Sequence, residues 1–451
     1  MTTGEPPDAA HPVFVEVSNT LSTHFTSGFQ RHTRALLAGL PTAAADDRGL
    51  LVTPVVWCTP CGRHRHLDSD EQERLRHAPA PSPPDRATLD RLAERLPTGV
   101  GRVVVHAADH GVVLRARERL ARLRRRRGHD PSAHPPLVSM PAGSVFFDLE
   151  AAWHDPAPRA ELLPRLRASG VRTGLLVADV MPDRHPEWFS TVTVEAFGRF
   201  LRAHLEHSDH VASISDQTTA DLLELAGSLG RTRPLEVVRI TMGSDFAGFG
   251  TAGATPAAAA AGAEAAASPV LLSVGTLEPR KNQGLLLDVF DRLRVDHPDI
   301  RLVLIGRPTD LCADLATRIV EHPCYGSTLR WERHVDDGQL EAAYRSAFLA
   351  LAPSRYEGYG IPVVEALAHG VPTIASTGGA LREAGGDMAE YADPDDADAW
   401  VRLIEHHLTD RAHHDLARRR VAAYRPPTWG AASRTLADAL VAMGGPGEAT
   451  R

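Results

Sequence analysis

Short apolar runs rich in β-branched residues alternate along the chain with longer stretches in which apolar positions recur at helical spacing. In the first half, the short runs predict strands at Val13–Val17, Leu51–Trp57, Arg102–His106, Ser144–Asp148, Thr173–Asp179, Val211–Ser215 and Glu236–Ile240. The stretches between them predict helices at Gly28–Leu40, Asp109–Arg127, Pro158–Ala168, Glu187–His207 and Asp216–Ala226. Further strands are predicted at Val270–Val274, Arg301–Ile305, Leu329–Glu332, Phe348–Leu351 and Thr373–Ala375. This alternation is typical of parallel sheets covered by helices on both faces.

The two series are separated by residues 248–269, which are rich in Ala with Gly and Thr and contain too few large apolar residues to anchor a core. We interpret this segment as a linker between a domain at residues 11–247 and a second domain at residues 270–425. An amphipathic helix within residues 426–445 is expected to pack back on the first domain. The fold class is therefore α/β, with two doubly wound domains facing each other across a cleft, and such sheets bind ligands at the carboxyl ends of their strands.

Composition and charge exclude several classes of protein. The chain has 451 residues, and 49 basic against 57 acidic residues give a formal charge of −8, which argues against a chain-wide nucleic-acid footprint. No apolar run approaches the roughly 18 residues that span a bilayer, and the first residues lack a signal-peptide pattern. Four cysteines are too few for a disulfide scaffold. A soluble, cytoplasmic protein is expected.

Of two phosphate-binding patterns, the dinucleotide fingerprint is disfavoured and the P-loop is excluded. Residues 248–253 fit a Gly-x-Gly-x-x-Gly spacing, but no strand runs into them and the Ala-rich run after them has no core-facing stripe. The single lysine of the chain, Lys281, follows Arg280 rather than a glycine, so no P-loop is present. Because Lys and Arg differ where a compact charge must fit, that lone lysine marks a place to inspect.

The segment from Arg355 to Leu367 follows a predicted strand, turns through two glycines and enters a helix with Pro362 at its first position. Glycines allow close approach of the backbone to a ligand, and a helix N-terminus presents N–H groups to an anion. Glu357 on the loop and Glu365 one turn inside the helix have carboxylates that accept hydrogen bonds from sugar hydroxyls. An ordinary strand–turn–helix connection with solvated acids remains open from these residues alone.

A second strand end, Val274 to Asn282, carries Arg280 and Lys281 side by side ahead of a predicted helix. The alternative is a capped helix start with solvated basic residues. Together, the two strand ends of one sheet provide an anion cradle, two cations and two acids that suit diols. This combination fits a sugar nucleotide, in which a diphosphate joins two polyols.

On these motifs the sequence resembles retaining glycosyltransferases of the GT-B fold, family four, and is similar to bacterial mannosyltransferase-like members. The family's paired glutamates, separated by seven residues, correspond to Glu357 and Glu365, and Glu-Pro-Arg-Lys-Asn corresponds to its diphosphate-binding strand end. The similarity extends through Ile305–Pro308, Leu340–Tyr344 and Leu381–Asp387, and in the first half through Ser27–His32, Asp148–His154 and Asp179–Phe189. It spans nearly the whole chain apart from the linker and both tails.

The resemblance implies a role for each matching residue. Lys281 and Arg280 are expected to hold the diphosphate, Glu357 the donor sugar and Glu365 the nucleotide ribose. The remaining donor-side residues would be Gly275, Thr276, Arg307 near the base, Gly358, Tyr359, Gly360 and Ile361. Gly28 and Gln30 fall on the acceptor side.

Two positions depart from the family pattern. Thr276 stands where many members carry Arg, so Arg280 is expected to take over that charge. Ala178 stands where many members carry a donor-contacting His, and Asp179 is the candidate substitute among the catalytic residues.

The expected reaction is transfer of a hexosyl unit, with mannose or a deoxyhexose favoured, from a nucleoside diphosphate sugar to a glycan, lipid-linked or small-molecule acceptor, with retention and without a metal or other cofactor. An epimerase or glycosyl phosphorylase of the same fold, and a non-catalytic nucleotide-sugar binder, are the alternatives. The Arg-rich helix Arg115–Arg127 is a candidate for peripheral contact with the inner membrane face, although a solvated face explains it too.

Three smaller features have structural interpretations. Asp68-Ser69-Asp70 precedes an amphipathic helix and is interpreted as a helix cap rather than a metal-binding acid pair. Cys58 and Cys61 with His64 and His66 make a weak zinc pattern, because a second Cys pair is missing. The pairs His406-His407 and His413-His414 are expected on the surface.

Overall fold

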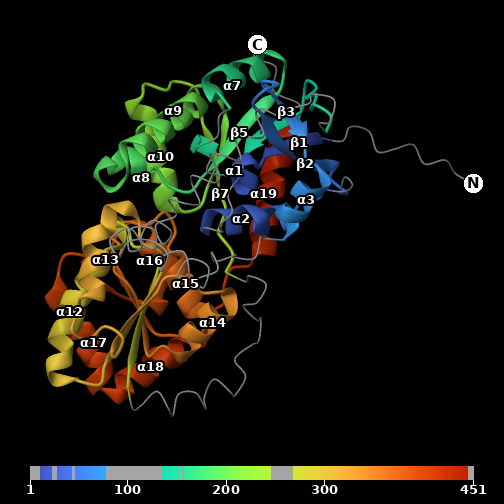
Figure 1. Ribbon diagram of the computed structural model, residues 1–451. Helices are drawn as coiled ribbons and strands as arrows, with labels where there is room; N and C mark the ends of the chain where they lie inside the picture. The colour runs from blue at the N-terminus through green and yellow to red at the C-terminus, as the bar shows by residue number, and fades with distance from the viewer. Residues whose placement is uncertain are drawn as a thin grey trace, which may run out of the picture.

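The computed structural model describes residues 11–22, 28–42, 46–77, 135–150, 152–154, 157–244 and 268–444. These form two α/β domains, the first in blue to green and the second in yellow to red in Figure 1. Expectations for residues 78–134, including the strand Arg102–His106 and the Arg-rich helix, lie outside the described residues, as does most of the linker. The predicted fold class, two Rossmann-like domains, is confirmed.

The sheet of the first domain has seven strands among the described residues, in the order β3-β2-β1-β4-β5-β6-β7. Its strands are β1 His11–Glu16, β2 Leu50–Cys58, β3 Arg63–His66, β4 Val145–Asp148, β5 Arg172–Val177, β6 His210–Ser213 and β7 Glu236–Arg239. All pairings are parallel except that of β2 with β3, which forms an antiparallel hairpin at the edge. Helices cover the sheet at α1 Ser18–Ser22, α2 Gly28–Ala38, α3 Ser69–Arg76, η2 Ala152–His154, α7 Arg159–Ala168, α8 Met181–Arg184, η3 Pro186–Trp188, α9 Thr191–His207 and α10 Asp216–Ser228.

The sheet of the second domain has six parallel strands in the order β10-β9-β8-β11-β12-β13. They are β8 Val270–Val274, β9 Arg301–Ile305, β10 Leu329–Glu332, β11 Leu349–Ala352, β12 Thr373–Ser376 and β13 Glu390–Ala392. The helices are η4 Pro279–Lys281, α12 Gln283–Asp296, η5 Asp310–Cys312, α13 Ala313–Val320, α14 Asp337–Ser346, α15 Ile361–Ala368, α16 Leu381–Gly385, η6 Gly386–Met388, α17 Ala397–Thr409 and α18 Arg411–Val421, after which the chain continues into α19 Trp429–Gly444. Strand order reverses between β8 and β11, where doubly wound sheets bind ligands.

Helix α19 returns to the first domain and packs against α2. The Ser433 hydroxyl donates a hydrogen bond to the Leu36 carbonyl at 3.0 Å, and Leu436 and Leu440 are buried in the core that lies beneath β1 and β2. In Figure 1 this red helix lies among the blue elements of the N-terminal domain. Helix α19 is therefore part of the first domain.

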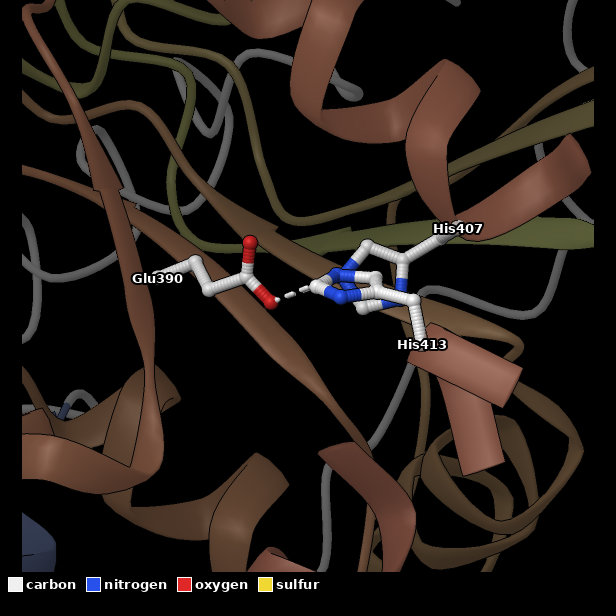
Figure 2. A group of neighbouring side chains, drawn as sticks. All are labelled: Glu390, His407 and His413. Carbon is white, nitrogen blue, oxygen red and sulfur yellow. Dashed lines mark ion pairs between the residues drawn. The ribbon is translucent and has the colours of Figure 1, made fainter. Parts of the chain in front are cut away.

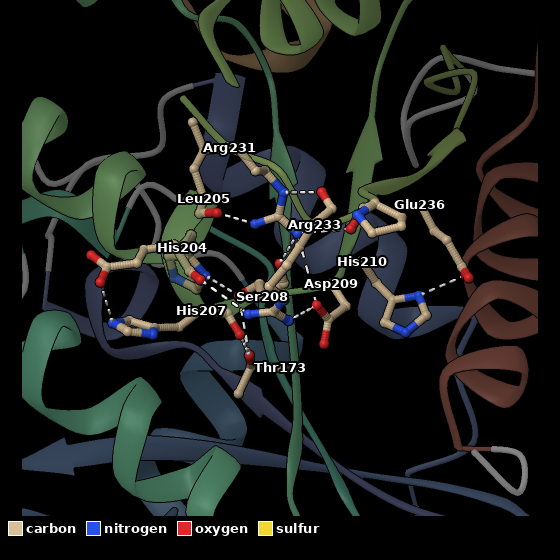
Figure 3. A network of polar contacts seen from close by, with 12 residues as sticks. Thr173, His204, Leu205, His207, Ser208, Asp209, His210, Arg231, Arg233 and Glu236 are labelled. Carbon is tan, nitrogen blue, oxygen red and sulfur yellow. Dashed lines mark hydrogen bonds and ion pairs between the residues drawn. The ribbon is translucent and has the colours of Figure 1, made fainter. Parts of the chain in front are cut away.

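Arginines anchor the end of α9 in the first domain (Figure 3). Arg231 donates to the carbonyls of Leu205 and, at 2.9 Å, Ser208, and Arg233 donates to the Glu206 carbonyl at 3.2 Å. Positive charge at a helix C-terminus is favourable because the last carbonyls lack helical partners. The network fixes the junction between α9 and β6.

The motif that begins at Asp148 has a structural role in this domain. Asp148 is fully buried, receives two hydrogen bonds from Arg159 at 2.8 and 2.7 Å, and contacts His204 Nε2 at 2.8 Å. Burial opposes ionisation, but the Arg159 guanidinium and His204 hold the pKa of Asp148 below its ordinary value. Glu150 accepts hydrogen bonds from the backbone of Asn19 and Thr20, at the start of α1.

Candidate donor-binding site

The carboxyl ends of β8 and β11 bring the two predicted strand-end motifs together. A pocket at this point is lined by Ser273, Val274, Lys281, Gln283, Ala352, Pro353, Ser354, Glu357, Pro362 and Leu381. Lys281 comes from the segment after β8, and Glu357 and Pro362 come from the segment after β11. The two motifs therefore meet at one small pocket at the switch point of the sheet, and its use as a ligand site stays a prediction.

Two glycines allow the ends of β8 and β9 to approach closely. Gly275 and Gly306 have φ angles of 153° and 148°, and a Cβ on Gly306 would collide with the backbone of Gly275. Past this point, Asn282 adopts a left-handed conformation with φ of 56°, and its amide donates to the carbonyls of Pro353 and Pro394 at 3.3 and 2.8 Å. Asn282 thus pins η4, with its two cations, against the loop after β11.

Glu357 is the centre of a buried charge cluster. Lys281 Nζ donates to Glu357 Oε1, Arg280 Nη1 donates to Oε2 at 2.8 Å, and the Ser354 hydroxyl donates to Oε1 at 2.6 Å. The glutamate is 7% exposed, so burial alone would raise its pKa. The charges of Lys281 and Arg280 outweigh burial and hold the pKa of Glu357 at about 2. This carboxylate is ionised throughout the physiological range.

The two cations of the cluster are engaged to different extents. Arg280 Nε also contacts Glu278 Oε2 at 2.8 Å, so its guanidinium is shared between two carboxylates, which together raise its pKa despite burial. Lys281 lines the pocket and has three donors, of which Glu357 accepts one. Lys281 is therefore the cation better placed to meet a ligand in the pocket.

Glu365 lies in α15 in a different environment. Its Oε2 accepts a hydrogen bond from the Tyr344 hydroxyl at 3.0 Å, whereas its Oε1 is buried and has no hydrogen-bond partner among the described residues. Arg31, on α2 of the other domain, has Nη1 at 3.9 Å from this oxygen. Burial raises the pKa of Glu365, and the Arg31 charge opposes that rise only in part. A buried acceptor left without a partner is a place where a hydroxyl donor would be favourable.

Asp179 and Ala178 bring the first domain to the glycine turn. A Cβ on Gly358 would collide with the Ala178 carbonyl, and the Thr218 hydroxyl lies 3.1 Å from the Ala178 carbonyl and 3.2 Å from that of Gly358. Asp179 Oδ1 accepts a hydrogen bond from the Met181 backbone at 2.9 Å. Burial raises the pKa of Asp179 against the attraction of Arg280 across the domain boundary.

Other contacts also close the domains on each other. The Glu383 carboxylate accepts hydrogen bonds from the backbone of Asp216 and Gln217 at 2.7 and 2.8 Å, at the N-terminus of α10. The Tyr359 hydroxyl donates to the Met242 carbonyl at 3.1 Å, so this predicted donor-site side chain packs between the domains. The Tyr356 hydroxyl donates to Asp221.

The remaining predicted residues surround this pocket at different distances from its centre. The Thr276 carbonyl accepts from Gln283 at 3.0 Å, and Arg307 is exposed at the end of β9, where burial of part of its side chain lowers its pKa. Gly360 has φ of 103° and precedes α15, which begins at Ile361; Pro362 is thus its second residue rather than the first. Gly28 begins α2.

Sequence reasoning missed three participants. Arg31, Ser354 and Tyr344 each contact one of the two glutamates. Arg31 follows the buried Gln30 in the α2 motif, and Tyr344 ends the Leu340–Tyr344 motif. Both residues could have been identified from the motifs in which they lie. Ser354 has no such signal, because a serine after a strand is common.

The smaller sequence-based expectations have different outcomes. Asp68 caps α3, with Glu71 completing a capping box, as predicted. The side chains of Cys58, Cys61, His64 and His66 form no metal-ligand group among the described residues, and His64 packs between the rings of Trp57 and Phe146. The surface expectation is wrong for His407 and His414, which are 2% and 8% exposed. Within the described ranges, every helix is too short or too polar to cross a bilayer.

Comparison with known families and proteins covers both halves of the chain. Residues 257–425 match the family described as glycosyl transferases group 1. The serotype-specific mannosyltransferase WbdA of Escherichia coli is 27% identical over 261 residues, which cover 55% of this chain and 32% of that protein. The phosphatidyl-myo-inositol mannosyltransferase of Mycolicibacterium smegmatis is 28% identical over 256 residues, which cover 56% of this chain and 60% of that protein. The matched region thus spans about a third of the former's length.

Solved structures share the architecture at low identity. Sucrose-phosphate synthase from Thermosynechococcus elongatus superimposes with a TM-score of 0.57 at 18% identity, covering 95% of this chain and 98% of that one. Anabaena HepE, solved in complex with UDP and glucose, gives a TM-score of 0.53 at 15% identity, covering 96% and 97%. These similarities establish the GT-B arrangement of two facing Rossmann-like domains.

Proposed function

We propose that this protein is a hexosyltransferase that uses a nucleoside diphosphate sugar as donor, because residues 257–425 match the family described as glycosyl transferases group 1. The observation that carries the proposal is the cluster of Lys281, Arg280 and Glu357 beside a pocket at the β8–β11 switch point. A pocket of this kind suits an anionic group, because a buried cation and a helix N-terminus face it together.

Each side chain then has a distinct task. Lys281, with donors to spare, contacts the diphosphate and stabilises the charge that develops on the leaving nucleotide. Arg280, which is shared between Glu278 and Glu357, holds the Glu357 carboxylate in place rather than taking the diphosphate on its own. Glu357, ionised and fixed, orients the hydroxyls of the donor sugar, and Glu365 accepts from the ribose through its unpartnered oxygen. Asp179 reaches this group from the acceptor-side domain.

The described pocket residues offer positioning and electrostatics rather than an obvious nucleophile. We therefore propose attack by the acceptor on the face that the nucleotide leaves, with retention at the anomeric carbon. Mannose is the favoured hexose because two of the relatives above are mannosyltransferases by name, with a deoxyhexose as the second choice. A glycan, lipid-linked or small-molecule acceptor would enter beside Gly28 and Gln30.

No metal or other cofactor is needed for transfer in this scheme, because Lys281 and the N-terminus of α15 supply the positive charge. The check is that turnover does not rise when Mg²⁺ is added to protein freed of metal. Contact of Arg115–Arg127 with an anionic membrane remains a prediction.

The proposal is tested with the full chain and a panel of nucleotide sugars. A true donor raises the melting temperature, and the same donor releases nucleoside diphosphate only when an acceptor is present. Conversion of the donor alone to another nucleotide sugar would identify an epimerase, and sugar phosphate formed from a glycan with inorganic phosphate would identify a phosphorylase. Stabilisation by a donor without turnover against any acceptor class would favour the non-catalytic binder and contradict transfer.

A further inference from the structure

Three side chains from three elements of the second domain point toward one another (Figure 2). Glu390 lies on β13, His407 in the last turn of α17 and His413 in the first turn of α18. Their nearest ligand atoms all lie within 4.8 Å of one another, and they form the single such group among the described residues. The proposed transfer reaction uses none of them.

The distances in this group match those between ligands of one small cation. Glu390 Oε1 lies 3.2 Å from His407 Nε2 and 3.1 Å from His413 Nε2. Nitrogen and oxygen ligands at about 2.0 Å from a tetrahedral zinc ion are separated by about 3.3 Å. The three atoms can therefore coordinate one ion with small side-chain adjustments.

Contacts within the group satisfy its polar atoms only in part. Among the described residues, Glu390 Oε1 and His413 Nε2 are buried atoms without a hydrogen bond of good geometry, although they lie 3.1 Å apart. The His407 side chain is 1% exposed and is directed at the same oxygen. Buried polar atoms left without partners are costly, and a metal ion would satisfy both of these atoms while also binding His407 Nε2.

A fourth side chain holds His407 in the orientation that a metal requires. His407 Nδ1 lies 3.2 Å from His414 Nδ1, and the His414 ring stacks on Phe348 with a centroid separation of 3.9 Å. When the His407 Nδ1–H donates to His414, the lone pair of Nε2 faces Glu390. Metal-bound histidines commonly have their second ring nitrogen fixed in this way.

The chain between the two histidines is short and capped. Asp410 is the one residue between α17 and α18. It caps α18 by accepting a hydrogen bond from the His413 backbone at 3.0 Å. Strand β13 ends at Ala392, and two residues later the Pro394 carbonyl accepts a hydrogen bond from Asn282, next to Lys281. An ion here would therefore join α17 and α18 to the strand that leads towards the donor pocket.

We propose that Glu390, His407 and His413 bind one divalent transition-metal ion, of which Zn²⁺ best suits two imidazoles and one carboxylate, with water in the fourth position. The ion has a structural role in the second domain and takes no part in transfer. Arg420 is the nearby cation that acts on Glu390, and the charge of the carboxylate offsets it.

The experiment titrates the full chain, freed of metal with a chelator, with Zn²⁺ in competition with a chromogenic chelator, and counts bound ions by atomic emission. One ion per chain is expected, with a rise in melting temperature, and Mg²⁺ should give neither effect because it prefers oxygen ligands. His413→Ala should weaken Zn²⁺ binding about a hundredfold. Its side chain is 23% exposed, so the variant should fold, which circular dichroism verifies.

His77→Ala is the control, because His77 follows α3 in the first domain, its side chain is 73% exposed and it pairs only loosely with Glu73 at 3.5 Å. This variant should keep the wild-type affinity. Glu390→Gln, which preserves shape, should weaken binding as His413→Ala does. Zn²⁺ affinity unchanged in His413→Ala and Glu390→Gln, or no stoichiometric binding by the wild type, overturns the proposal. Neither result bears on transfer, which is measured separately.

Discussion

Glu357 and Glu365 are eight positions apart and border the same end of the sheet, yet their surroundings differ in kind. Glu357 sits among two cations and a hydroxyl, and both of its oxygens are occupied. Glu365 accepts one hydrogen bond through Oε2, whereas its Oε1 has Arg31 at 3.9 Å but no hydrogen-bond partner within the described part of the chain. Burial is common to both, so the difference in their pKa values, lowered in one and raised in the other, comes from their neighbours.

This comparison separates two ways of preparing a site for a ligand. The region of Glu357 is organised before any ligand arrives, because its charges already fix each other. The region of Glu365 is incomplete, and a ligand hydroxyl would supply the missing hydrogen bond. Preorganised charge favours the developing transition state, whereas an unfilled acceptor favours ground-state binding.

The largest effect is expected from Lys281→Ala, which removes the pocket-facing cation of the organised region. Turnover should fall about a hundredfold or more, because the leaving diphosphate loses a direct charge partner. The measurement is kcat for nucleotide release with a saturating donor. Arg292→Ala, which removes an exposed cation of α12 paired with Asp398, is the control and should leave kcat unchanged. A Lys281→Ala enzyme as fast as the wild type would contradict the assigned role.

Glu357→Gln should disrupt the same charge cluster, and the effect should appear as a loss of folding stability. At pH 7 the free energy of unfolding should fall by about 3 kcal/mol, because removing one partner leaves buried cations facing each other. The folded pKa, about 2, lies below the ordinary value of 4.5, so the contribution of the carboxylate is present above pH 4.5. It is lost as pH falls towards 2, and the gap between wild type and variant should close over that range in denaturant titrations.

Glu278→Gln serves as the matched comparison for this variant. Among the described residues, Glu278 forms an ion pair only with Arg280, and its side chain is 26% exposed, so its loss should cost clearly less stability than the loss of Glu357. Equal losses in the two variants would mean that Glu357 is not the centre of the cluster.

Most of the fold could be predicted from the sequence, because strands buried in a parallel sheet consist largely of apolar residues. Val270–Val274, Arg301–Ile305 and Leu329–Glu332 are strands over the predicted bounds. The edge strand β3, with the sequence Arg-His-Arg-His, was missed because it has no apolar residue to reveal it. The predicted helix Glu187–His207 is divided, since Ser190 caps α9 by accepting from the Thr193 backbone.

The site was predictable in its members but not in its electrostatics. Spacing and resemblance identified both glutamates and the Arg280-Lys281 pair, and the switch point of the sheet brings them together. Which cation pairs with which carboxylate depends on the left-handed turn at Asn282, and the contact of Arg31 with Glu365 depends on how the domains meet. The local sequence pattern encodes neither the pairing of the charges nor the contact of Arg31 with Glu365.

Glu365→Gln should sharpen the contrast, because it affects binding rather than stability. A folded pKa raised above its ordinary value means that this acid favours the folded state below the unfolded pKa and loses that contribution as pH rises through the folded pKa. At pH 7 the variant should therefore be as stable as the wild type or more so. Its affinity for the nucleoside diphosphate should fall about tenfold, as calorimetry would measure, because a charged acceptor binds hydroxyls more strongly than an amide. Unaltered affinity would remove Glu365 from the ribose role.

The smallest effect is expected from Arg31→Gln, which changes Glu365 from across the domain boundary. Arg31 lowers the pKa of Glu365 and Asp337 raises it, so removing Arg31 should raise that pKa further. If the ribose hydroxyls need the ionised carboxylate, the pH at which donor affinity reaches half its maximum should move upward in Arg31→Gln. Asp337→Asn should move it downward, because it removes the opposing charge from an exposed position. Shifts of the same sign in both variants would show that the domain contact, rather than the charge on Glu365, sets the affinity.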